Sequence, residues 1–372
     1  MFAVLLLAPI AVLLLQARST VDEDLVLVRG ERHGVEYLRA LNQVTVALVD
    51  AQSAAVTGTP VPAGPLDEAA AAMAAIDARI GAELLAQERW GGLQAKIGTL
   101  VQQRPASAQE AMVAYGEAGE LLLELYAKVR KVSGLARDPE SGSYHLQNAL
   151  TAELPDTLVN FGRVADLAAV TALSNGVERD RAVAQLGAAR AGAHTSGRDL
   201  IDDLLAAETE HSDLSGQVPD EIDALQQALE TLGASLRFST APAAGGAGAT
   251  GRQLTVDAAS LATARRMAQA AAVKLADLIV ADLDGQLAAR EEHLVGRHRL
   301  VLGMAGLAAL LALAAVGTAL LAPLAQRGDA GPGRGAASAQ RRPADGAAAP
   351  AGHDRDAALD GAAGTGPVDA PR

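Results

Sequence analysis

Apolar residues recur every three or four positions along most of the chain, which is the spacing of one face of an α-helix. The pattern is clear over 20–54 and again from Ile222 to Leu236. The first stripe consists of Val21, Leu25, Val28, Val35, Leu38, Leu41, Val44 and Leu48. A last stripe begins near Thr255 and meets no proline before Pro323. These spacings predict long amphipathic helices packed in a bundle.

Prolines and capping residues predict where the other helices begin and end. Three prolines follow the first stripe, and a helix is expected over 67–103. Ser107, with Glu110 three residues later, forms a capping-box pattern for a helix that ends near 135. Further helices are expected over 144–167, 178–212 and 219–236. The segment 241–251 is interpreted as a Gly/Ala linker, and no strand pattern is found.

Two apolar runs frame the amphipathic part. Met1–Leu15 would rise about 22 Å as a helix, less than the roughly 30 Å core of a bilayer. Because it lacks a basic flank and an A-x-A site, we interpret it as a signal anchor. A cleaved signal peptide and a longer span that starts upstream are alternatives. Leu300–Leu324 carries no charge and is long enough to cross a membrane, the alternative being a buried core helix.

The predicted fold class is therefore all-α, with an elongated helical-bundle ectodomain between two transmembrane helices and a disordered C-terminal tail. The segments are an anchor over 1–18, the bundle over 19–298, a transmembrane helix over 299–324 and the tail over 325–372. The tail holds almost no large apolar residue and cannot bury a core. Arginines after the second run favour a cytoplasmic C-terminus, which places the bundle outside.

Composition supports helices and excludes several classes of protein. Half of the 372 residues are hydrophobic but only 2% are aromatic, and Ala and Leu favour helices over strands. The absence of cysteine excludes disulfide scaffolds and thiolate metal sites, and the net charge of −13 argues against nucleic acid as a partner. Phosphate-loop, dinucleotide and nucleophile-elbow motifs are missing, and the seven histidines are scattered. No enzymatic activity, cofactor or metal is predicted.

Two polar stretches interrupt this uniform pattern. In 34–39, an acid and an arginine lie three positions apart beside the apolar stripe, which indicates either a binding site or a surface ion pair. In 133–148, an Asp-Pro turn leads into a tyrosine-bearing helix, which indicates either a polar pocket or an interhelical loop. The candidate ligand-binding residues are Glu36, Arg39, Asp138 and Tyr144.

The same stretches carry a family resemblance. Gly34–Leu41 resembles the G-V-E-Y-L-R-P-L segment of bacterial sensory ectodomains. Asp138–Leu146, followed by Leu154 and Pro155, resembles their L-D-P-D-x-D-S-Y-Y-L-M-D…L-P segment. Those proteins are methyl-accepting chemotaxis proteins and related sensor histidine kinases and diguanylate cyclases. The resemblance covers roughly residues 1–325.

The resemblance implies a membrane-bound receptor of the chemoreceptor type in the bacterial cytoplasmic membrane, with its main domain extracytoplasmic. It would contact membrane lipid, form a homodimer, bind a small molecule or a periplasmic binding protein, and pass the signal through the second span. No linker or output domain follows that span in the sequence, so we expect a receptor that lost its output by truncation or frameshift. The alternative is a membrane-anchored helical scaffold without a ligand.

Overall fold

The computed structural model describes residues 2–61, 63–136, 141–210, 216, 218–242 and 250–325. The chain divides into two units, Met1–Ala315 and Val316–Arg372. The second unit is described only over the last turns of one helix, so the predicted tail lies outside the described residues from 326 onward. Almost every described residue is helical, which confirms the all-α prediction at the level of fold class.

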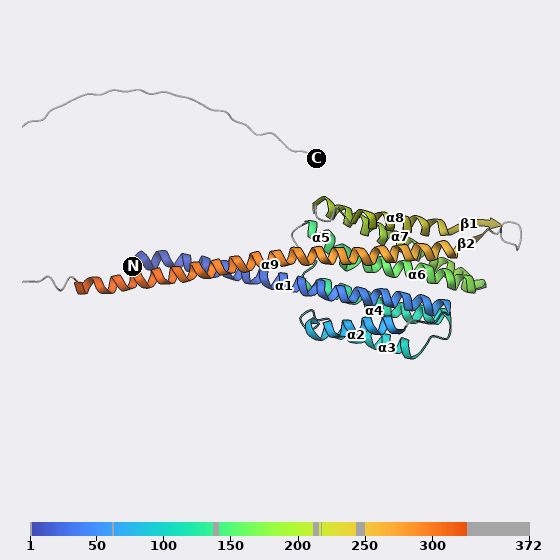
Figure 1. Ribbon diagram of the computed structural model, residues 1–372, viewed down its shortest axis with the longest axis horizontal. Coiled ribbons are helices and arrows are strands. Elements are labelled where there is room, and N and C mark those ends of the chain that lie inside the picture. The colour runs from blue at the N-terminus through green and yellow to red at the C-terminus, as the bar shows by residue number, and fades with distance from the viewer. Residues whose placement is uncertain are drawn as a thin grey trace, which may run out of the picture. The chain divides into compact units, whose positions relative to one another are not determined.

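Long helices make up the first unit, and several of them lie along one another (Figure 1). In chain order the elements are α1 (Phe2–Thr57), α2 (Ala63–Ile80), α3 (Gln87–Gln102), α4 (Ala108–Ser133), α5 (Ser141–Asn148), the π-helix η1 (Ala149–Glu153), α6 (Leu154–Leu173), α7 (Gly176–Glu210), α8 (Val218–Ser235), β1 (Leu236–Pro242), β2 (Thr250–Val256) and α9 (Ala258–Ala325). Helix α1 contacts α2, α4 and α6, while α7 contacts α5, α6 and α8.

The apolar stripe of α1 lies in the core of the molecule. All eight of its predicted residues are buried, and they belong to one apolar cluster with residues of α9. Helices α1 and α9 run antiparallel, because Asp22 contacts His298 while Asp50 contacts Arg265. The prediction that the last stripe continues into the apolar run is confirmed, since α9 is one uninterrupted helix.

Close approach between α1 and α4 depends on two glycines of α1. A Cβ at Gly34 would lie 2.6 Å from Ser133 Cβ and 2.9 Å from Leu135 Cδ1. A Cβ at Gly30 would lie 2.9 Å from the Ser133 carbonyl oxygen. The two polar stretches singled out in the sequence therefore meet through backbone packing at the end of α4.

The prediction of a single helix over 67–103 is wrong, because the structure has two helices there, α2 and α3. Gly81 lies against Asp77, whose Oδ1 would be 2.1 Å from a Cβ at that position. The turn that follows contains Leu85 at a φ of 50°, a left-handed conformation that ends a regular helix. The Ser107 cap is confirmed, since its hydroxyl accepts from the Glu110 amide at 3.2 Å.

The expectation of no strand is also wrong, because two strands overlap the ends of the segment 241–251, whose residues 243–249 lie outside the described residues. Strands β1 and β2 pair antiparallel from Leu236 opposite Val256 to Pro242 opposite Thr250. The Gly/Ala-rich composition between them obscured two short strands, and among the strand residues whose side chains are described the buried apolar ones are Leu236 and Leu254. Two buried positions are too few to produce a strand pattern in the sequence.

One candidate membrane span is found among the residues whose side chains are described. It lies in Ala258–Ala314, within α9. Most of its large apolar side chains from Leu300 to Val316 are exposed in the single chain, as the lipid-facing side chains of a span would be, while Val301 is buried. The predicted anchor over 1–18 is not among the candidates, and the side chains of its first eleven residues lie outside the described set.

Candidate ligand-binding cavity between α1 and α9

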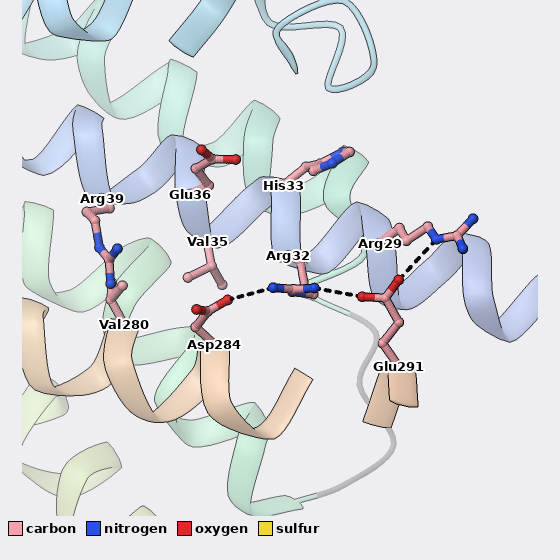
Figure 2. A pocket seen from close by; sticks show the side chains of 9 residues that line it. All are labelled: Arg29, Arg32, His33, Val35, Glu36, Arg39, Val280, Asp284 and Glu291. Carbon is pink, nitrogen blue, oxygen red and sulfur yellow. Dashed lines mark hydrogen bonds and ion pairs between the residues drawn. The ribbon is translucent and has the colours of Figure 1, made fainter. Parts of the chain in front are cut away.

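A cavity of about 470 Å³ opens between α1 and α9 (Figure 2). Its α1 wall is almost entirely charged, and α9 closes the opposite side with two acids and one apolar residue. The lining residues are Arg29, Arg32, His33, Val35, Glu36, Arg39, Val280, Asp284 and Glu291. Two of the four residues chosen from the sequence, Glu36 and Arg39, therefore lie in one cavity.

Helical spacing explains why these side chains share a wall. The charged positions 29, 32, 36 and 39 of α1 are three or four residues apart and lie on one face, at the border of the buried stripe. Asp284 and Glu291 are seven residues apart on α9 and share a face for the same reason. Because the two helices are antiparallel, the arginines of α1 lie opposite the acids of α9.

Arg32 is the centre of the ion pairs across the cavity. Its Nη1 donates to Glu291 Oε2 at 2.7 Å, and its Nη2 lies 3.5 Å from Asp284 Oδ1. Arg29 Nε donates to the other Glu291 oxygen at 3.2 Å. The hydrogen bond from Arg32 lowers the pKa of Glu291, and the bond to Glu291 raises the pKa of Arg32. Both groups are therefore charged at neutral pH.

Two side chains at the rim of the cavity pair with residues of α2 and of the turn after it. Arg79 of α2 donates to both carboxylate oxygens of Glu36, and this hydrogen bonding lowers the pKa of Glu36. His33 Nδ1 lies 2.8 Å from Glu83 Oε2 in the turn between α2 and α3. Glu36 and His33 thus each have a partner outside the cavity.

Arg39 is different from the other cations. Its guanidinium has no hydrogen bond or ion pair with any residue that the structure describes, and it is exposed. Figure 2 shows the side chain extending from α1 toward Val280 of α9, away from both acids of the opposite wall. Its charge acts on the nearby Glu36, but the guanidinium itself has donors that a small anion can pair with.

The other two sequence candidates are not in this cavity. Tyr144 lies in α5 with 41% of its surface exposed, and its ring meets His145 edge-on at 5.6 Å between centroids. Asp138 lies outside the described residues. Of the described candidates, the structure brings together Glu36 and Arg39, which are close to each other on α1.

A second polar cluster joins α5, η1 and α7 to α4. His145 Nδ1 lies 2.9 Å from Asp203 Oδ1, and Asn148 donates to Asp203 Oδ2 at 2.6 Å and accepts from Arg130 at 2.8 Å. Burial, with nearby acids of α7, raises the pKa of Glu153 to about 7. Sequence reasoning missed this cluster, although the helical spacing of His145 and Asn148 was a visible signal.

Neither a protein-family model, nor a curated protein, nor a solved structure matches this chain. A functional assignment must therefore rest on the geometry of the cavity, on the membrane character of α9 and on the two short segments that resemble sensory ectodomains.

Proposed function

We propose that this protein is a membrane-bound sensory receptor of the chemoreceptor type, which binds a small anionic signal in the α1–α9 cavity. The observation that carries the proposal is the course of α9. The same uninterrupted helix supplies one wall of the cavity, through Asp284 and Glu291, and the apolar run from Leu300 onward. A change in the cavity wall is thereby linked to the candidate membrane span by a single rigid element.

The proposed signal is a small shift of α9 along or around its axis. An anion that binds Arg39 adds a negative charge beside two acids of α9, and it competes with them for the arginines of α1. Weaker pairing between Arg32 and Asp284, the longer of its two contacts, would let α9 move relative to α1. Receptor switching by helix displacements of about 1–2 Å at such interfaces is well established.

The proposed setting is the bacterial cytoplasmic membrane, with the cavity on the extracytoplasmic side and the receptor in a homodimer. The two segments that resemble sensory ectodomains support this setting. The exposed apolar side chains of α9, including Leu307 and Leu311, supply the surface for lipid and for a second copy.

A ligand screen tests the proposal. The full chain in lipid nanodiscs is heated with amino acids, organic acids and nitrogen oxyanions, and a bound anion raises the melting temperature by linkage. The Arg39→Gln variant should lose this rise, while Arg198→Gln, which removes an exposed arginine of α7, should keep it. If no compound raises the melting temperature, or if both variants respond like the wild type, the protein is instead a membrane-anchored scaffold without this site.

A further inference from the structure

A second, smaller cavity lies at the C-terminal end of α1. It has a volume of about 170 Å³ and is formed where the α1–α2 and α3–α4 connections meet the side of α4. Its walls are Ala55, Gly58, Thr59, Val61, Leu66, Leu100, Val101, Arg104, Pro105 and Tyr115. It shares no residue with the α1–α9 cavity, and the sixteen helical steps of α1 from Arg39 to Ala55 separate the two by about 24 Å.

The polar groups of this cavity are few and specific. Tyr115 is 1% exposed, yet its hydroxyl has no hydrogen-bond partner among the described residues. The hydroxyl oxygen itself is not fully enclosed by protein, so it can donate a hydrogen bond to a ligand in the cavity. Burial raises the pKa of Tyr115, so the group is a neutral O–H donor at physiological pH.

Arg104 supplies a positive charge at the same place. It is exposed at the edge of the cavity and forms no ion pair with any described residue. Arg104 and Tyr115 line the same cavity, so one ligand can contact both residues. A nearby acid, Glu110, is turned elsewhere and accepts from the Ala106 amide at 3.0 Å.

The remaining walls are mostly apolar, and the volume limits the size of the occupant. Leu66 is fully buried, and Leu100 is nearly so. At about 170 Å³ the cavity is smaller than the α1–α9 cavity, which favours a small ligand. Arg104 is the one charged residue among the described residues that line it, and one cation matches a single negative charge.

We propose that this cavity is a binding site for a short-chain monocarboxylate. The carboxylate pairs with the Arg104 guanidinium and accepts a hydrogen bond from the Tyr115 hydroxyl, and the alkyl chain packs against Leu66 and Leu100. The proposed carboxylate site does not depend on the proposed anion site at Arg39, so an experiment can contradict one proposal without contradicting the other.

Calorimetric titration of the full chain in lipid nanodiscs with butyrate tests the site, with butyramide as the neutral analogue of the same shape. Butyrate should bind saturably, and butyramide at least about ten times more weakly, because it cannot form the charged pair. Arg104→Gln should weaken butyrate binding at least about tenfold, and Tyr115→Phe by about three- to tenfold for a neutral hydrogen bond. Arg198→Gln, which removes an exposed arginine of α7, should leave the affinity unchanged.

Circular dichroism establishes that each variant is folded before it is titrated. Tyr115→Phe keeps the buried ring, and Arg104 is exposed, so both variants should retain the wild-type helical signal. Failure of the folded wild-type protein to bind butyrate would overturn the proposal. So would equal affinity for butyramide, or an Arg104→Gln variant that binds butyrate as tightly as the wild type.

Discussion

The antiparallel pair of α1 and α9 has two halves that are held together differently. In the charged seam, residues 18–39 face 284–298, and arginines of α1 pair with acids of α9 at the edge of the apolar stripe. In the apolar seam, residues 40–57 of α1 and 258–283 of α9 contribute to one apolar core. There Leu41, Leu275 and Ile279 are completely buried, and the Asp50–Arg265 pair joins the two helices in the same half.

The difference indicates where a ligand can act on α9. Ion pairs at partly exposed positions each contribute about 0–1 kcal/mol and weaken with salt, so a bound anion can compete with them. Burial of a whole leucine contributes about 1.5–3 kcal/mol and does not respond to salt. The apolar seam thus fixes the two helices together, while the charged seam, which adjoins the apolar run, can be adjusted.

The largest expected effect comes from breaking the apolar seam. Leu275→Ala should lower the free energy of unfolding by about 2–5 kcal/mol, because it leaves a cavity in the core between the helices. Thermal unfolding followed by circular dichroism measures the change. Leu205→Ala on α7 is the matched control, since that leucine is 44% exposed and its truncation should cost under about 0.5 kcal/mol. Equal losses in the two variants would contradict this description of the core.

A smaller loss of stability is expected from a change where the charged seam of α1 packs against α4. Gly34→Ala should destabilise the protein by about 1–3 kcal/mol, because the new methyl group would overlap Ser133 and Leu135. Gly92→Ala in α3 has nothing within 4 Å of its new Cβ and should instead stabilise the helix by about 0.5–1 kcal/mol. Chemical denaturation of both variants checks the opposite signs. A stabilising Gly34→Ala would show that the helices do not approach this closely.

The pH response of the second polar cluster can be separated from that of the charged seam. The pKa of Glu153 is raised to about 7, so its ionisation disfavours the folded state increasingly as pH rises from about 4.5 toward 7. Glu153→Gln should therefore be more stable than the wild type by about 1 kcal/mol near pH 8, after a discount for partial exposure, and equal to it near pH 4. A gain that persists in acid would indicate a packing effect instead.

The smallest effect on stability is expected for the ion pairs themselves. Arg32→Gln should cost about 1 kcal/mol at low salt and less in about 0.5 M NaCl. The lowered pKa of Glu291 stabilises the folded state above that group's ordinary pKa, and this contribution is lost as pH falls through the lowered value. The variant should thus lose less stability than the wild type on acidification. Arg89→Gln removes a more exposed pair and should show a weaker salt response.

The sequence predicted the features that depend on local spacing. Stripes of period 3.6 located α1, α8 and α9, and the cap at Ser107 located the start of α4, because these signals are carried by neighbours along the chain. The break at Gly81 could not be predicted, because it depends on the side chain of Asp77 in the folded turn. The hairpin was missed because few of its residues carry the alternation of a strand.

The candidate site shows the same limit. Glu36 and Arg39 were identified because they lie beside the apolar stripe of one helix. Their environment was not predictable, since Asp284 and Glu291 are about 250 residues away and no pattern in the sequence sets the register between α1 and α9. Arg104 and Tyr115 were missed although they are eleven residues apart, because Arg104 lies in the α3–α4 connection and its position beside α4 depends on the turn between the helices.

The most direct test of the central claim is a distance measurement between α9 and a reference helix. The chain has no cysteine, so spin labels can be attached uniquely through Gln94→Cys on α3 and His293→Cys on α9, both at exposed positions. With the anion that raises the melting temperature, the interspin distance in nanodiscs should shift by about 1–2 Å, and Arg39→Gln should abolish the shift. An unchanged distance in protein that demonstrably binds the anion at Arg39 would contradict the account, because binding would not move α9.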